Sequence, residues 1–147
     1  MKFQIQAAEK QLAKIGPEIK EMVRKVAKEK AQIVQLEREL KSQEKGLEKS
    51  YDEMVTLREH LESGDSVYVA TNGKGYHNAH VEEDLRNRFS VYQTAEQTVE
   101  KSSQIIEIRK QGLESAMAKL DDAKVMQREL EVPVSYTHLT LPTICSV

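Results

Sequence analysis

Three histidines and four acidic residues gather around one short segment in the middle of the chain. They are His60, His77, His80, Asp65, Glu82, Glu83 and Asp84. Two histidines and a carboxylate supply ligand atoms of the kind that zinc prefers. His77 and His80 are close in sequence, but His60 precedes them on another part of the chain, and spacing of this kind is common by chance. We therefore expect surface histidines and no metal site; His60, His77 and His80 are the candidate ligands if one exists.

Two tyrosines and a lysine in the same segment are candidates for contact with a partner protein. Tyr68 and Tyr76, with Lys74 between them, would form an exposed recognition patch. The alternative is that the tyrosines pack the segment against neighbouring helices beside Leu85 and Phe89, because an isolated β-hairpin needs something to pack on. The string "TNGKG" around Lys74 lacks the phosphate-binding loop pattern.

The sequence contains no set of residues that is typical of a catalytic site. The sequence shows no nucleophile beside a base and no pair of carboxylates in a concave site. The only cysteine, Cys145, lies near the end of the chain, so thiol chemistry is excluded for residues 1–132. We expect no enzymatic activity and no cofactor.

The elements that carry these residues are predicted by apolar side chains that recur every seven positions. The first row of the N-terminal half is Ile5, Leu12, Ile19, Val26, Ile33, Leu40, Leu47, Met54 and Leu61. Its companion row is Ala8, Ile15, Met22, Glu29, Leu36, Gln43, Ser50 and Leu57. The C-terminal half has a first row of Leu85, Tyr92, Val99, Ile106, Leu113 and Leu120, and a smaller, more polar companion row of Arg88, Ala95, Ser102, Arg109, Ala116, Ala123 and Leu130. This alternating spacing predicts two long coiled-coil helices.

A turn between the two sets of rows is predicted by the intervening residues. Turn formers at residues 63–65 end the first helix. The β-branched string "SVYVA" and the tight-turn signal "TNGKG" predict a β-hairpin of residues 66–70 with 74–77, and Asn78 is suited to cap the second helix. A reversal around Gly73 lets the two first rows share layers, with partners whose residue numbers add up to about 146.

The predicted fold is therefore an all-α, long antiparallel two-helix coiled-coil hairpin with a small β-hairpin at the tip. We expect a first helix over residues 1–62, the tip over 63–78, a second helix over 79–132 and a disordered tail over 133–147. Pro17, next to Gly16, predicts a kink in the first helix. Gly46 and Gly112 predict bends or close contacts between the helices.

Composition narrows the choice of partners. Basic and acidic residues number 22 and 24, so no overall field favours nucleic acid. Residues 1–30 contain eight basic and four acidic side chains, which favours an anionic membrane surface as an alternative partner. No run approaches the length of a membrane span. Val23, Val34 and Val55 lie beside the predicted seam, so we expect self-association into an oligomer.

Three strings carry a resemblance to known proteins: "SVYVATNGKGY", "VEEDLRNRFSVYQTAEQTVE" and "AKVMQRELEV". They resemble uncharacterised bacterial coiled-coil hairpin proteins, in which a small β-hairpin interrupts the coil. More distantly, residues 30–132 resemble the phage-shock-protein-A family, which binds and remodels membranes, although the β-hairpin departs from that family's short helical bend. We expect a cytoplasmic structural or interaction protein; the alternative is a protein peripheral to the inner membrane.

The last residues differ in kind from the rest of the chain. Residues 133–147 contain no Lys, Arg, Asp or Glu. The string "VSYTHLTLPT" resembles the translation of a transposase-type sequencing adapter. We therefore expect residues 134–147 to be non-native and the chain to be a fragment of a longer protein that continues after Val132.

Overall fold

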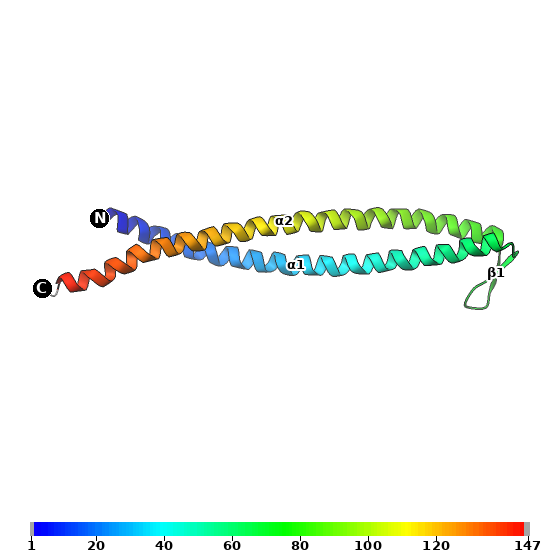
Figure 1. Ribbon diagram of the computed structural model, residues 1–147, viewed down its shortest axis with the longest axis horizontal. Helices are drawn as coiled ribbons and strands as arrows, with labels where there is room; N and C mark the ends of the chain where they lie inside the picture. The colour runs from blue at the N-terminus through cyan, green and yellow to red at the C-terminus, as the bar shows by residue number, and fades with distance from the viewer. Residues whose placement is uncertain (1, 146–147) are drawn as a thin grey trace. The chain divides into compact units, whose positions relative to one another are not determined.

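The computed structural model describes the backbone of residues 2–145 and the side chains of residues 2–132. Helix α1 spans Lys2–Ser63, strand β1 Val67–Val69, strand β2 Gly75–His77 and helix α2 Asn78–Cys145. The two strands lie between the two long helices in the chain and pair antiparallel (Figure 1). The predicted helical hairpin with a small β-hairpin is confirmed.

The chain divides into two compact units, and each unit contains a part of both helices. Unit 1 comprises residues 1–33 and 108–147, and unit 2 comprises residues 34–107, including the β-hairpin. Each unit therefore contains one segment of α1 and one segment of α2, and in unit 2 the β-hairpin connects these segments.

Burial follows the predicted rows closely. Every described position of the four rows is buried or half-buried except Gln43 and Arg88. The buried apolar residues are Ile15, Ile19, Val26, Ile33, Met54, Leu57, Val81, Ile106 and Leu120. Val81 lies seven residues before Arg88 and extends the companion row of α2 by one position beyond the prediction. A seam only two rows wide explains why so few side chains are fully shielded from water.

The core of unit 1 gathers around one cluster of buried side chains. Ile15, Ile19, Val26 and Leu120 form this cluster. Half-buried side chains packed against it are Leu12, Met22, Leu113, Ala116 and Ala123. Val26 and Leu120, which the predicted reversal pairs with each other, lie in the same cluster.

A polar layer interrupts the apolar seam of unit 1. Arg109 of α2 donates from Nε to Oε1 of Glu29 at 2.7 Å and from Nη2 to Oε2 at 2.9 Å. The same Nη2 also donates to Oε1 of Gln32 at 2.8 Å. Glu29 and Arg109 both occupy row positions, so this bidentate ion pair takes the place of an apolar layer. Hydrogen bonding from Arg109 lowers the pKa of Glu29 below its ordinary value.

Gly46 and Gly112 do not mark close approaches of the helices, contrary to one of the two explanations predicted for them. A Cβ atom built at either position would meet nothing within 4 Å apart from the local helix backbone. Helix α1 also continues through Gly16 and Pro17 without a break.

The second helix extends beyond residue 132, where it was predicted to end. Helix α2 continues to Cys145. The side chains of residues 133–147, and residues 146–147 altogether, lie outside the described part of the chain. The non-native origin predicted for this segment is therefore a question of sequence and remains a prediction.

Candidate recognition site at the β-hairpin

The end of α1 and the turn at the hairpin are set by two glycines in the left-handed backbone region. Gly64 has φ 81° directly after α1, and Gly73 has φ 82° between the strands. A side chain at either position would be strained, whereas glycine is not. The turn is closed by two backbone hydrogen bonds, from Ala70 N to Lys74 O and from Gly73 N to Ala70 O, both at 2.9 Å.

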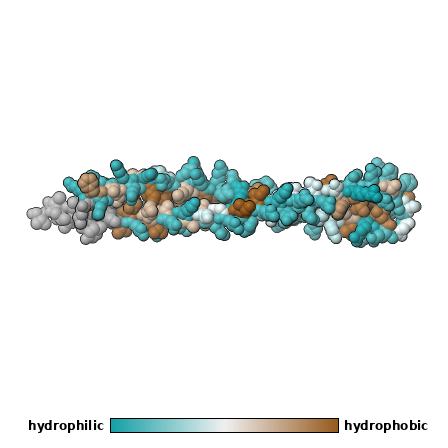
Figure 2. Space-filling view, turned by 90° about the horizontal axis from the view of Figure 1, so that it is seen from above, coloured by the Kyte–Doolittle hydropathy of each residue, from teal (hydrophilic) through white to brown (hydrophobic). Residues whose placement is uncertain are grey.

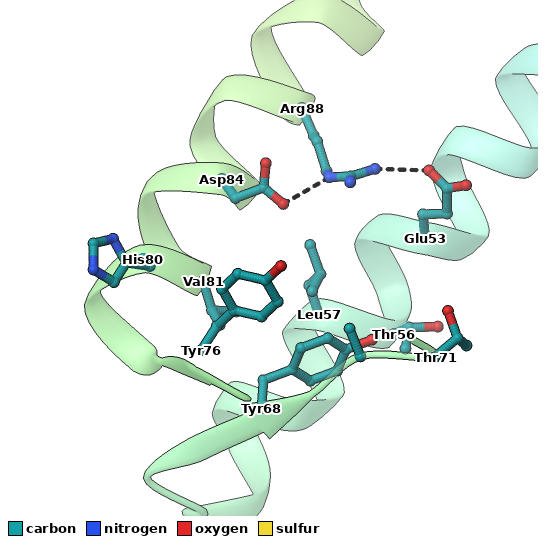
Figure 3. A pocket seen from close by; sticks show the side chains of 11 residues that line it. Glu53, Thr56, Leu57, Tyr68, Thr71, Tyr76, His80, Val81, Asp84 and Arg88 are labelled. Atoms are coloured by element: carbon teal, nitrogen blue, oxygen red, sulfur yellow. Dashed lines mark hydrogen bonds and ion pairs between the residues drawn. The ribbon is translucent and has the colours of Figure 1, made fainter. Parts of the chain in front are cut away.

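The register of the strands places the two tyrosines opposite each other. Tyr68 pairs with Tyr76, flanked by Val67 with His77 and Val69 with Gly75. Directly opposite residues in a strand pair point to the same face. The two tyrosine rings therefore share one face of the hairpin, as Figure 3 shows.

The tyrosines form one wall of an open recess of ≈ 860 Å³, which we call the tip recess. Helix α1 contributes Glu53, Thr56 and Leu57 to its lining. Helix α2 contributes His80, Val81, Asp84 and Arg88. Leu57 and Val81 are buried and provide apolar surface beneath the rings. Figure 2 shows brown apolar surface bordered by teal at the end that carries the hairpin.

One ion pair of Arg88 joins the two helices of unit 2, and a second lies within α2. Arg88 Nη1 lies 2.7 Å from Glu53 Oε2, and Arg88 Nε lies 2.8 Å from Asp84 Oδ2 (Figure 3). Hydrogen bonding to Asp84, assisted by the charges of both carboxylates, raises the pKa of Arg88 above its ordinary value. The position of Arg88 in a heptad row explains why its long side chain reaches out of the seam to find these partners.

Asn78 connects the three segments that meet at the tip. Its Nδ2 donates to the Asp65 carbonyl oxygen at 2.8 Å, and its Oδ1 lies 2.8 Å from His60 Nε2. Because Oδ1 is an acceptor only, His60 must carry a proton on Nε2. Asn78 was predicted to cap a helix that starts at residue 79, but it is itself the first residue of α2. Its side-chain bonds go to α1 and to the loop.

The three candidate zinc ligands have separate surroundings. The His60 ring stands edge-on to Tyr68 with centroids 5.1 Å apart. His77 is exposed in β2, and the His80 ring points away from the two tyrosines (Figure 3). Among the described residues, no group of three or more His, Cys, Asp or Glu side chains is placed to hold a metal ion.

The predicted recognition residues are partly brought together. Tyr68 is half-buried and Tyr76 is 41% exposed, and both line the tip recess together with Leu57 and Val81, so each side chain is partly packed and partly open to solvent. Lys74 lies in the turn and is not part of the lining. Glu53 was not predicted for the site, and Asp84 was noted only among the acidic residues near the candidate metal ligands. Arg88 was recognised only as a polar interruption of a row.

The recess offers binding groups of three kinds: aromatic faces, tyrosine hydroxyls and an ion-pair network with two carboxylates for one guanidinium. Such a lining suits contact with polar or cationic side chains of another protein. Comparison with protein-family models, with curated protein sequences and with solved structures found no match to this chain. Within the described residues, no helix has the length and apolar character needed to cross a membrane.

Proposed function

We propose that the chain is a non-enzymatic structural protein, a coiled-coil hairpin that serves as a scaffold, spacer or assembly element and associates with further copies of itself. The observation that carries the proposal is apolar surface outside the paired rows. Val91 and Ile105 of α2 are 69% and 54% exposed, and Val23 and Val34 of α1 are also exposed.

These side chains gain free energy if another copy covers them. Full burial of a valine or isoleucine side chain is worth about 1.5–3 kcal/mol, so covering side chains that are half-exposed or more yields roughly 1 kcal/mol each. Val91 and Ile105 lie two heptads apart in one column, with Thr98 between them. Positions beside the seam of a two-stranded coiled coil are often charged, so apolar residues at such positions favour contact with a further helix.

Sedimentation equilibrium over a wide range of protein concentration tests the proposal. We expect a mass above that of one chain at micromolar concentration and a shift toward one chain on dilution. A single chain at every concentration would contradict the proposed self-association.

A second candidate function is peripheral binding to an anionic membrane, which a specific observation at the N-terminus favours. Phe3 is 88% exposed on a segment that is rich in lysine. An aromatic side chain together with basic residues on one helix is typical of segments that lie at a membrane surface. Co-sedimentation with vesicles of anionic lipid tests this candidate, and the Phe3→Ser variant should bind more weakly. Equal recovery of the chain with neutral and anionic vesicles would count against it.

A further inference from the structure

Unit 1 contains a recess of its own, which has an apolar floor and a basic rim. Its volume is ≈ 580 Å³. The floor includes Met22, Val26 and Leu113, and the small residues Gly112 and Ala116 leave the space that a larger row or flanking side chain would fill. We call this the lysine-rimmed recess, because Lys25, Lys28 and Lys119 also line it.

The three rim lysines are available to a ligand. Within the described residues, none of them has an ion-pair partner, whereas the guanidinium of Arg109 in the same lining is paired with Glu29. An apolar floor surrounded by unpaired ammonium groups suits an apolar side chain that is flanked by carboxylates. Contacts of this kind combine burial of apolar surface with charge complementarity.

The distribution of charge over the two units indicates where such a ligand is found. Unit 1 contains 13 basic and 9 acidic residues, a net charge of +4. Unit 2 contains 9 basic and 15 acidic residues, a net charge of −6. The two units therefore have opposite net charges, although the whole chain has a net charge of only −2. These opposite charges attract unit 1 of one copy to unit 2 of another.

One side chain of unit 2 has the features that the lysine-rimmed recess requires. Phe89 of α2 is 53% exposed. Glu82 and Glu96 lie seven residues before and after it in the same column of the helix, which places each about 10 Å along the axis. An exposed phenylalanine between two carboxylates of one column is an aromatic anchor with an acidic border.

We propose that the lysine-rimmed recess in unit 1 of one copy receives Phe89 in unit 2 of a second copy, with Glu82 and Glu96 against the rim lysines. This inference rests on the proposed self-association and identifies its interface. The two surfaces differ from each other, so each copy carries one recess and one anchor. An interface made of two different surfaces can be broken from either side and restored by mixing.

Two variants of the full chain separate the two sides of the interface. Phe89→Ser removes the anchor, and the double variant Lys25→Glu with Lys119→Glu reverses the charge of the rim. All three residues are exposed, so both variants should retain the helical circular dichroism of the parent chain. Ile108→Ser is the matched control, because it removes an apolar side chain that is more exposed than Phe89 from a different column of the same helix.

Sedimentation equilibrium at low ionic strength then distinguishes the outcomes. Each of the two variants should associate with itself roughly tenfold more weakly or worse, as is usual for loss of an interface anchor. The control should associate within about threefold of the parent chain, because its lost contact is not part of the anchor. An equimolar mixture of the two variants should form a complex of one copy of each, since one intact recess meets one intact anchor.

Other results would overturn the inference in recognisable ways. Self-association of the parent chain that is unaffected by Phe89→Ser and by rim reversal leaves the proposed assembly function standing but removes this interface. Failure of the mixture to form the mixed complex also removes it. A parent chain that never associates removes both the interface and the assembly function.

Discussion

Replacing glycine by alanine should raise the stability of this chain inside the helices and lower it at the two glycines with positive φ. Alanine substitution therefore tests the fold in both directions. Gly46 and Gly112 lie in the interior of α1 and α2, where an added methyl group meets nothing within 4 Å. Glycine in a helix interior costs about 0.8–1 kcal/mol relative to alanine. We therefore expect Gly46→Ala and Gly112→Ala each to increase the free energy of unfolding by about that amount.

The two substitutions lie in different units, so their effects should add to roughly 2 kcal/mol. For a chain of this size, this corresponds to a rise in the melting temperature of roughly 4–8 °C. Gly64→Ala and Gly73→Ala are the controls of opposite sign, because their φ angles of 81° and 82° are strained for an L-residue. Left-handed backbone costs about 1–2 kcal/mol for such residues, so both controls should destabilise the chain.

Urea unfolding followed by far-ultraviolet circular dichroism measures all four variants against the parent chain. A loss of stability of more than about 0.5 kcal/mol in Gly46→Ala or Gly112→Ala would refute the reasoning. It would mean that the helices approach each other more closely at these positions than the structure shows.

Three further predictions concern the core of unit 1, the polar layer and the tip. Leu120→Ala should cost about 2–3 kcal/mol, and a double-mutant cycle with Val26→Ala should show coupling of about 0.5 kcal/mol or more; strict additivity would contradict their contact. Arg109 lowers the folded-state pKa of Glu29, so the stability from this carboxylate is present above its unfolded-state pKa and is lost as pH falls through the folded value. In the Glu29→Gln variant, the free energy of unfolding should therefore decrease less steeply below about pH 4 than in the parent chain. The same decrease in both chains, measured by urea unfolding at a series of pH values, would count against the ion pair. Asn78→Ala removes two hydrogen bonds at the tip and should cost about 1–2 kcal/mol, with faster amide hydrogen exchange in the β-hairpin; unchanged exchange there would show that the bonds are dispensable.

The two long helices could be predicted from the sequence, because in a two-helix coiled coil the seven-residue repeat alone determines which side chains face the partner helix. Row positions as different as Ile33, Ser50 and Glu29 are all shielded to some degree, although only the first is apolar. Shielding therefore depends on the position of a residue on the helix face. Gln43 and Arg88 depart from the pattern because long polar side chains can leave the seam and reach water or a charged partner.

The tip recess could be predicted only in part. The shared face of Tyr68 and Tyr76 follows from the turn at Gly73, since strand pairing fixes which residues oppose each other. The approach of Glu53 and Asp84 to Arg88 depends on how far each helix is rotated about its axis, which sequence spacing does not specify. The hydrogen-bond partners of Asn78 could not be predicted from the sequence either, because they are a loop carbonyl and a histidine of the other helix.

The hydrogen bonds between the helices imply an order of folding. His60 and Asn78 are 18 residues apart, whereas Glu29 and Arg109 are 80 residues apart. The entropy lost in closing a loop grows with the logarithm of its length, so closing the longer loop from an unfolded chain costs about 1.3 kcal/mol more. Contacts near the β-hairpin should form first, and each further layer of the coil then closes only a few additional residues. Unit 2 is therefore expected to fold before unit 1, as a zipper that starts at the tip.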